Sequence, residues 1–281
     1  NYGAAYCRRS TPEFEGCLFT NNEFFAAKLH DSMGNAHPAV GTAKFTNCTF
    51  SNNNSGGVVT GSCIQIGDWM DLELSNCLFE NNGGSSIFSS YSYSEGDTVI
   101  TDCVFRDNDT SAGSSGGLIV ENERDGHFNM QGCLFESNRS EYQLKVGSNT
   151  FNDASIEVSD SVFKNNMGSG IIVDGWVTTM NIENSTVKGN SVGGISSWSG
   201  SVDHWEVTIT NTTVCSNEEY QIDNDDWIDG GGNTVTEVCF NDCQAADITD
   251  DGIVDISDIL AILGYWGSSI PAGDVDGNGV V

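Results

Sequence analysis

The chain is poor in basic residues. Only 10 of its 281 residues are Lys or Arg, against 40 Asp and Glu, so the formal net charge is −30. Lys188 is the last basic residue, and none occurs in the 93 residues after it. A surface of this sign repels nucleic acid and anionic membranes and attracts divalent cations. We therefore expect no nucleic-acid partner, and we expect cations to bind.

Long apolar runs are also lacking, because no segment approaches the length that a bilayer-spanning helix needs. We therefore expect no membrane insertion. The chain begins with Asn1 rather than Met, as a chain would whose export signal has been removed. Little Lys, together with much Asn, Ser, Thr and Gly, is typical of a secreted solenoid. The expected location is secreted, extracellular or at the cell surface.

One six-residue motif recurs along most of the chain. Its clearest copy is Cys-Leu-Phe-Glu-Asn-Asn at residues 77–82. The eight copies begin 24 to 31 residues apart, at Cys17, Cys48, Cys77, Cys103, Cys133, Ser161, Ser185 and Thr212. A nearly constant period of this length predicts a stack of repeated structural units.

Each repeat has the alternation of β-strands. With the first motif residue as position 0, apolar residues stand at −5 and −3, and again at 0 and +2 with the opposite parity, so a bend must lie between. The expected bend residues, all tolerant of unusual backbone angles, are Gly16, Asn47, Asn76, Asp102, Gly132, Asp160, Asn184 and Asn211. A third apolar column is expected at Val58, Ile87, Leu118, Leu144, Ile171, Ile195 and Ile222.

Three short strands per repeat cannot bury their own inward residues, but stacked repeats can. The sequence therefore predicts an all-β fold, a single-stranded parallel β-helix of about eight coils over residues 1–243. Its Phe residues would stack in the interior, and its Asn residues at +5 would form a ladder. A β-sandwich does not explain why the same residue types recur in register. Residues 1 to about 240 resemble the right-handed parallel β-helix superfamily, the shape also used by pectate lyases.

Five of the ten cysteines share position 0, which is an inward column. They could form disulfides between coils or act as small buried thiols. Stacked residues with parallel Cα–Cβ bonds fit disulfide geometry poorly, and Ser or Thr replaces Cys in the later repeats, so we expect thiols that fill space. Cys239 and Cys243 lie outside the column, and a disulfide involving them is expected, with Cys215 as a competing partner for Cys239.

The last part of the chain, residues 244–281, carries a different signal. Oxygen-bearing residues recur at the spacing of a calcium-binding loop, with Gly252 at the sharp turn and Ile253 offering its carbonyl. The expected ligands of the first loop are Asp247, Thr249, Asp251, Ile253, Asp255 and Asp258. A second, incomplete loop supplies Asp274, Asp276 and Asn278. Ile259, Ile262, Leu263 and Trp266 would line one face of the intervening helix.

Residues 245 to 281 resemble the dockerin family, whose two loop-helix units bind calcium and dock into cohesin domains. The resemblance implies Ca²⁺ as the cofactor and a cohesin-like protein as a partner. The second unit stops at Val281, and the helix lacks the basic residues that members often use to grip cohesin. Calcium-stabilised folding therefore carries over better than cohesin binding.

No catalytic residue is predicted. A polysaccharide lyase needs a Lys or Arg base near a bound cation, and no basic residue lies in a cluster of acidic ligands. A β-helix hydrolase needs Asp residues on adjacent coils, and Asp225–Asp226 is the only pair in the later coils, with Asp153, Asp174 and Asp203 on loops at differing positions. His127 beside Asp125 is more typical of a structural histidine.

Five tryptophans fall outside the predicted buried columns, where they could stack on sugar rings or cover the bases of loops. They are Trp69, Trp176, Trp198, Trp205 and Trp227. The leading interpretation is a secreted, non-catalytic solenoid, a structural, adhesive or filament-forming subunit with a calcium-dependent tail. Its partner would be itself, stacked head to tail, or a cohesin-like protein. The alternative is a polysaccharide-binding or polysaccharide-cleaving β-helix attached through a dockerin.

Overall fold

The fold comes from a computed structural model of the 281-residue chain. The described residues are 3–8, 10–30, 41–53, 62–67, 70–89, 97–110, 117–122, 127–148, 155–175, 179–198, 206–223 and 227–239, with Leu260, Ala261 and Leu263. The chain divides into two units, Asn1–Glu237 and Val238–Val281. The first unit contains all the described strands, and the three described residues beyond residue 239 are helical.

Three sheets of nine strands each build the first unit. Sheet 1 contains β1 (Ala5–Arg8), β4 (Phe25–His30), β7 (Ser62–Ile66), β10 (Ser85–Ser89), β13 (Gly117–Asn122), β16 (Arg139–Ser148), β19 (Met167–Gly175), β22 (Gly193–Trp198) and β25 (Tyr220–Asp223). Sheet 2 contains β2 (Glu13–Glu15), β5 (Thr42–Thr46), β8 (Asp71–Ser75), β11 (Thr98–Thr101), β14 (His127–Gln131), β17 (Ser155–Ser159), β20 (Thr179–Glu183), β23 (Glu206–Thr210) and β26 (Ile228–Asp229). Sheet 3 contains β3 (Leu18–Thr20), β6 (Thr49–Ser51), β9 (Leu78–Glu80), β12 (Val104–Arg106), β15 (Leu134–Glu136), β18 (Val162–Lys164), β21 (Thr186–Lys188), β24 (Thr213–Cys215) and β27 (Thr234–Thr236).

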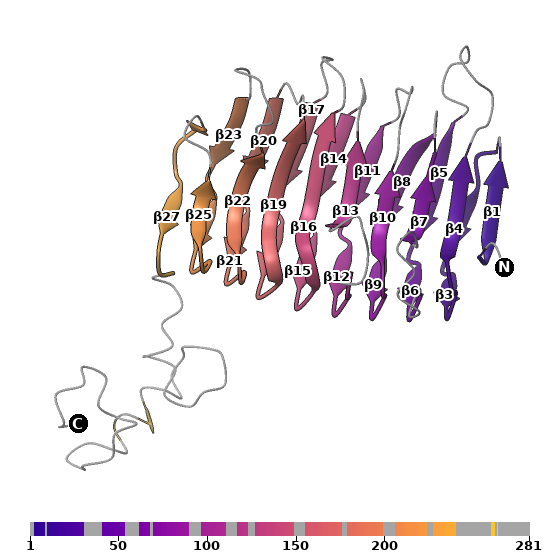
Figure 1. The fold of residues 1–281 in the computed structure, drawn as a ribbon, viewed down its shortest axis with the longest axis horizontal. Helices are drawn as coiled ribbons and strands as arrows, with labels where there is room; N and C mark the ends of the chain where they lie inside the picture. Colours follow the sequence, from indigo (N-terminus) through magenta and orange to yellow (C-terminus); the bar gives the residue numbers. More distant parts are fainter. Residues whose placement is uncertain are drawn as a thin grey trace. The chain divides into compact units, whose positions relative to one another are not determined.

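Every strand up to β24 pairs in parallel with the strand three places further along the chain, which is the topology of a solenoid. Figure 1 shows the resulting row of coils, with β1 at one end and β25 and β27 at the other. The predicted all-β parallel solenoid is confirmed. It has one coil more than the eight motif copies, because β25, β26 and β27 form a last coil in which Asn233 takes position 0.

The coils turn at residues that tolerate a left-handed backbone. All eight predicted bend residues have positive φ, between 49° and 67°. A second left-handed corner at position +4, which was not predicted, is formed by Asn21, Asn52, Asn81, Asp107, Ser137, Asn165, Gly189 and Ser216. Asn, Asp and Gly adopt this conformation at low cost, so the same residue types recur at both corners.

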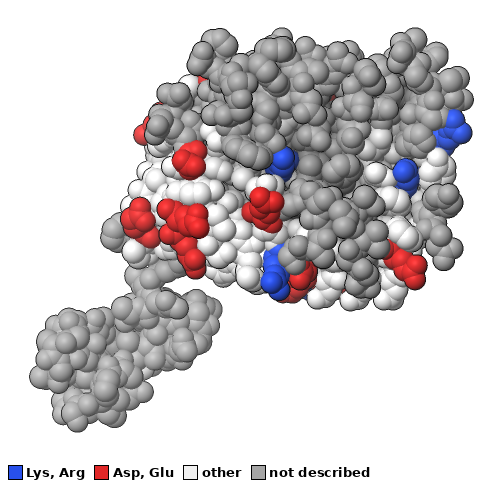
Figure 2. Space-filling model, viewed as in Figure 1, with Lys and Arg blue, Asp and Glu red and all other residues white. Residues whose placement is uncertain are grey.

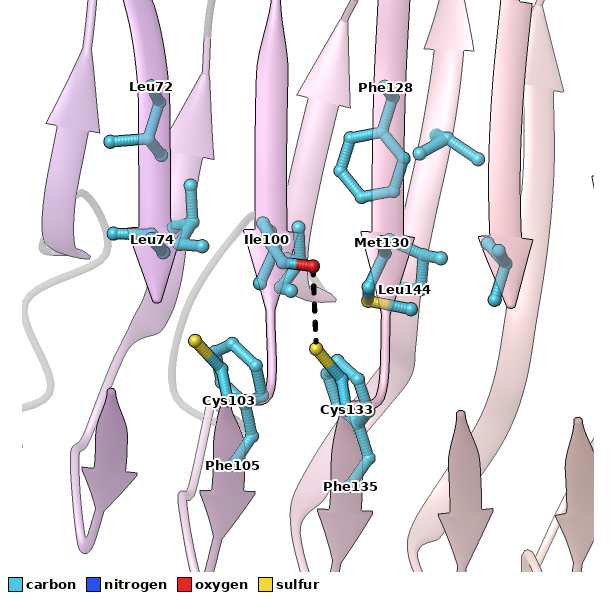
Figure 3. Packing of buried hydrophobic residues seen from close by; sticks show 14 of the residues in the cluster. Leu72, Leu74, Ile100, Cys103, Phe105, Phe128, Met130, Cys133, Phe135 and Leu144 are labelled. Carbon is cyan, nitrogen blue, oxygen red and sulfur yellow. Dashed lines mark hydrogen bonds between the residues drawn. The ribbon is translucent and has the colours of Figure 1, made fainter. Parts of the chain in front are cut away.

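The interior is a set of stacked columns. Six phenylalanines from Phe19 to Phe163 stack with ring centroids 4.5 to 4.8 Å apart. Figure 3 shows Phe105 and Phe135 in this column below Ile100 and Met130. The third apolar column is confirmed from Ile87 onward with one correction, since Ile119 rather than Leu118 pairs with Ile87. Ile64 pairs with Ile87 on its other side, and the expected Val58 lies outside the described residues.

The cysteine column consists of free thiols, as predicted. Cys48, Cys77, Cys103 and Cys133 are buried and unbonded. Cys133 donates a hydrogen bond to the Ile100 carbonyl (Sγ–O 3.8 Å; Figure 3). A hydrogen bond with Cys133 raises the pKa of the Cys103 thiol to about 12, so this thiol stays protonated and unreactive. Cys215 and Cys239 are each disulfide-bonded.

The predicted asparagine ladder runs along the corner between sheet 3 and sheet 1. From Asn53 to Asn190, each Asn side chain is at most 1 % exposed. Asn138 shows the pattern: its Oδ1 accepts from the backbone N–H and the amide of Asn108, and its Nδ2 donates to Asn166 Oδ1 and to the Phe105 carbonyl. Because the side-chain amides of the ladder, from Asn53 to Asn190, are satisfied by the coils on either side, the ladder fixes the register of the stack.

No helix in the described part of the chain is long and apolar enough to cross a membrane. In the second unit, Leu260 and Leu263 are exposed.

Candidate functional site

The predicted calcium ligands lie outside the described residues. These are Asp247, Thr249, Asp251, Ile253, Asp255, Asp258, Asp274, Asp276 and Asn278. Calcium binding by the tail therefore stays a prediction. Elsewhere, within the described ranges, no group of three or more His, Cys, Asp or Glu side chains could hold a metal ion.

Polar residues line up on the solenoid surface at repeat position −6, where the strands of sheet 2 begin. Successive coils place there Thr42, Asp71, Asp97, His127, Ser155, Thr179 and Glu206. The sequence prediction considered paired aspartates only in the later coils, and the column places Asp71 and Asp97 on adjacent earlier coils. The position could have been found by counting back six residues from each motif, but its residue types vary too much to stand out.

Hydrogen bonds tie this column to the backbone. Asp71 Oδ1 accepts the N–H of Asp97, and Asp97 Oδ1 accepts the N–H of His127, each at 3.0 Å. The His127 ring lies beside Ser155, with Nδ1 and Oγ 2.9 Å apart. Each carboxylate therefore holds the start of the next strand in place.

The Ser155–His127 contact has the spacing of a nucleophile and its base, but a serine triad also needs a carboxylate that orients the imidazole. Here the Asp97 carboxylate bonds the backbone of His127 and not its ring. His127 and Asp97 are exposed to solvent, which weakens any electrostatic activation. Chemically, the column offers carboxylate, imidazole and hydroxyl groups to a ligand more readily than it offers an activated nucleophile.

Several basic side chains bind acidic neighbours on the adjacent coil. Lys44 pairs with Glu73, Arg106 with Glu80 (2.8 Å) and Lys164 with Glu136 (2.9 Å). The hydrogen bond to Glu73 holds the pKa of the Lys44 ammonium above its ordinary value.

A catalytic base of the lyase type needs a lowered pKa so that it can accept a proton. The pKa of Arg106 is likewise raised, by its hydrogen bond to Glu80. These ion pairs join neighbouring coils and are unsuited to proton abstraction.

Of the tryptophan and aspartate side chains singled out in the sequence, the structure describes only some. Trp227 is half-buried and packs against the core, and it follows Val207 in register directly before β26. It therefore belongs to an interior column, contrary to the expectation. The other four tryptophan side chains lie outside the described residues, as do those of Asp125, Asp153, Asp174, Asp203, Asp225 and Asp226.

A comparison with protein families matches residues 37–214 of this chain to the model described as right handed beta helix region. No curated protein and no solved structure matches. The matched segment covers most of the solenoid and runs from a point between β4 and β5 into β24.

Proposed function

This chain belongs to the right-handed β-helix family, and we propose that it is a secreted, non-catalytic solenoid that serves as a structural or adhesive subunit and docks through a calcium-binding tail. The proposal rests on one observation: charged side chains of the solenoid bind the neighbouring coil. Lys44, Arg106 and Lys164 pair with the adjacent coil, and the carboxylates of Asp71 and Asp97 hold backbone N–H groups. Side chains that join neighbouring coils in this way stiffen the solenoid, as a scaffold requires.

Disulfide chemistry supports export. Bonded cysteines such as Cys215 and Cys239 persist in oxidising compartments and are rare in reducing ones. The free thiols of the interior are compatible with such a location, because burial raises the pKa of Cys63 well above its usual range and keeps it from oxidation.

The tail supplies the attachment in this proposal. Its first loop has hard oxygen donors at positions 1, 3, 5, 9 and 12, a carbonyl at position 7 and Gly252 at the turn. Because such a loop is acidic and self-repelling without its ion, calcium would fold the tail. The folded tail would then bind a cohesin-like protein or, if subunits stack head to tail, another copy of the chain.

Calcium titration of the full chain tests the tail. We expect calorimetry to detect binding that Asp251→Ala abolishes or weakens at least tenfold, since position 5 contributes a charged ligand. Glu183→Ala is the matched control, because it removes an exposed acidic residue from sheet 2 without touching either loop. Equal binding by the wild type and Asp251→Ala would contradict the assigned loop.

A catalytic assay tests the other half of the proposal. The protein is incubated with neutral and uronate-containing polysaccharides, and reducing ends and unsaturated uronates are measured. No turnover is expected. Turnover by the wild type that Asp97→Ala abolishes would show that the protein is an enzyme and would contradict the non-catalytic proposal.

The second candidate is a polysaccharide-binding or polysaccharide-cleaving solenoid carried by the same tail. The observation in its favour is the run of Asp71, Asp97 and His127 on three consecutive coils. Retention of the wild type on a polysaccharide affinity gel, lost in Asp97→Ala and kept in Glu183→Ala, would support binding. Glu183 is a suitable control because it is an exposed carboxylate elsewhere on sheet 2.

A further inference from the structure

The outer face of sheet 3 carries a row of apolar side chains at repeat position +1. The strands of this sheet are three residues long, so the middle residue points inward and the two flanking residues point outward. Four successive coils place at +1 the half-buried Leu78, Val104, Leu134 and Val162. On the corresponding strands of sheet 2, from β8 to β17, Val99 is the one apolar residue that points outward. The apolar row is therefore particular to sheet 3.

Beside the apolar row, position +3 carries charges of alternating sign. The same four coils place there Glu80, Arg106, Glu136 and Lys164. Within the chain, Arg106 bonds Glu80 at 2.8 Å and Lys164 bonds Glu136 at 2.9 Å. On the face that Figure 2 shows, an acidic and a basic group meet at the lower edge, where Figure 1 places the strands of sheet 3. With Lys188 on the next coil, the row has three basic and two acidic residues, although the whole chain has a formal net charge of −30.

The charge row is complementary to its own reverse. Consider a two-fold axis that lies parallel to the strands, between β12 and β15, in the plane of the outer face. It lays sheet 3 of a second copy on sheet 3 of the first, with the solenoid axes antiparallel. Glu80 of one copy then faces Lys164 of the other, and Arg106 faces Glu136. Each of these four charges thereby gains an opposite charge across the contact.

Other positions of the axis do not give this match. An axis through β12 sets Glu80 against Glu136, and an axis through β15 sets Arg106 against Lys164. An axis between β15 and β18 sets Arg106 against Lys188. An axis between β9 and β12 gives an opposite charge only to Glu80 and Arg106. Because like charges repel, the row selects the axis between β12 and β15.

The corners that flank sheet 3 fit the same register. With the axis between β12 and β15, Asp102 faces Gly132 of the second copy, and Asp107 faces Ser137. No acidic corner residue of these two coils therefore meets another carboxylate. In a chain with so many acidic residues, a face that avoids such repulsion is suited to contact with a second copy.

We propose that the outer face of sheet 3 is a self-association surface, through which two copies pair side by side with antiparallel solenoid axes. The apolar rows cover each other, with Val104 against Leu134 and Leu78 against Val162. A symmetric contact uses the same patch twice and closes on itself, so assembly stops at the dimer. The strip from β6 to β21 is about 24 Å long at the usual strand spacing. The pairing goes beyond the proposed function, because it needs neither the tail nor calcium.

Sedimentation velocity of the full chain over a hundredfold range of concentration tests the proposal. The expected species is a dimer of twice 30.0 kDa, present both with calcium and with a chelator. Arg106→Glu should weaken the dimer at least tenfold, because it turns two attractive contacts across the axis into repulsive ones. Lys44→Glu is the matched control. It breaks an ion pair with Glu73 and likewise adds a carboxylate between two others, but on sheet 2, and should leave the dimer unchanged.

A charge swap separates pairing between copies from pairing within one chain. The double variant Arg106→Glu, Glu136→Arg restores opposite charges across the axis, but it does not restore the ion pairs with Glu80 and Lys164 inside the chain. It should therefore recover most of the dimer that Arg106→Glu loses. Failure of the double variant to recover it, while circular dichroism shows both variants folded, would contradict the proposed register.

Cross-linking of the wild type keeps the test independent of how the variants fold. A carbodiimide joins a Lys ammonium to a carboxylate without a spacer. Glu80 and Lys164 are three coils apart in one chain, about 14 Å at the usual strand spacing, but they face each other across the proposed contact. Mass spectrometry of mixed isotope-labelled and unlabelled protein should therefore find Glu80–Lys164 links between the two kinds of chain.

Three results would overturn the proposal: a monomer at every concentration, a dimer that Arg106→Glu leaves intact, or a dimer without the Glu80–Lys164 link. A dimer that the chelator dissolves would place the contact in the tail. That result would overturn this inference and leave the proposed function standing, because calcium binding by the tail is tested separately.

Discussion

The middle of the solenoid and its first and last described coils have related residues but are stabilised differently. In the middle, each interior side chain has a similar one on the coil before and the coil after, as Phe105 lies between Phe79 and Phe135. In the last coil, Gln221 accepts the N–H of Asn217 at the end of the ladder, yet Val235, which follows Val214 in register, is 38 % exposed. The comparison teaches that stacking on both sides, and not the motif by itself, buries the interior columns.

The largest expected difference concerns the phenylalanine column. Phe105→Ala removes a fully buried ring that is stacked on both sides and should lower the free energy of unfolding by about 4 kcal/mol. Phe14→Ala, on the half-exposed first coil, should cost about 1 to 2 kcal/mol because less of its surface is buried. Urea unfolding followed by tyrosine and tryptophan fluorescence measures both. Equal losses would mean that the first coil is as well packed as the middle.

The asparagine ladder should show the next largest contrast. Asn138→Ala leaves the donors of Asn108 without their acceptor in a buried site and should cost about 3 kcal/mol. Asn22→Ala removes donors to Asn53 at the half-exposed start of the ladder and should cost about 1 kcal/mol. The same urea titrations apply. A small effect at Asn138 would show that the stack holds its register without the amides.

The closing residue Gln221 should have a smaller effect. Gln221→Ala leaves the N–H and amide of Asn217 without an acceptor at the end of the ladder, which should cost about 1 to 2 kcal/mol. Gln131→Ala serves as the control, because Gln131 bonds Asp160 on the exposed surface and should cost less than about 0.5 kcal/mol. If the two variants unfold at the same urea concentration, Gln221 does not close the ladder.

Surface ion pairs should have the smallest effect. Lys164→Gln removes a pair with Glu136 whose side chains are about one-third exposed, and it should cost roughly 0.2 to 1 kcal/mol at low salt. Added salt should shrink the difference between variant and wild type, because it screens exposed charges. A salt-independent loss would mean that Lys164 stabilises the coils through packing of its aliphatic stem.

Much of the fold followed from the repeat because identical neighbours impose local rules. The bend at −1 was predictable since Asn, Asp and Gly recur there. The corner at +4 carries Asn, Asp or Gly in six of its eight copies and could have been predicted in the same way, although Ser137 and Ser216 interrupt the pattern. The last coil was missed because Asn233 and Val235 replace the motif's usual Cys and Phe. Register also decided between Leu118 and Ile119, since one residue more or fewer in a corner changes which side chain faces inward.

The surface was harder to predict than the interior. The alignment of Asp71, Asp97 and His127 depends on strand register and not on a shared residue type. The role of Trp227 depends on being in the coil where stacking ends. The roles of these residues depend on their neighbours in space. An alignment of the repeats shows those neighbours only after the strand register of every coil is known. The calcium loops are a local pattern, and they stay a prediction for the titration to decide.

Amide hydrogen exchange tests most directly the claim that stacking on both sides holds the solenoid together. The account predicts that the backbone N–H groups of Asn108 and Asn138, which donate to buried ladder amides, are among the slowest to exchange. The N–H of Asn22 donates to Asn53 in the half-buried first coil and should exchange faster. Exchange of the Asn138 N–H as fast as that of Asn22 would contradict the account.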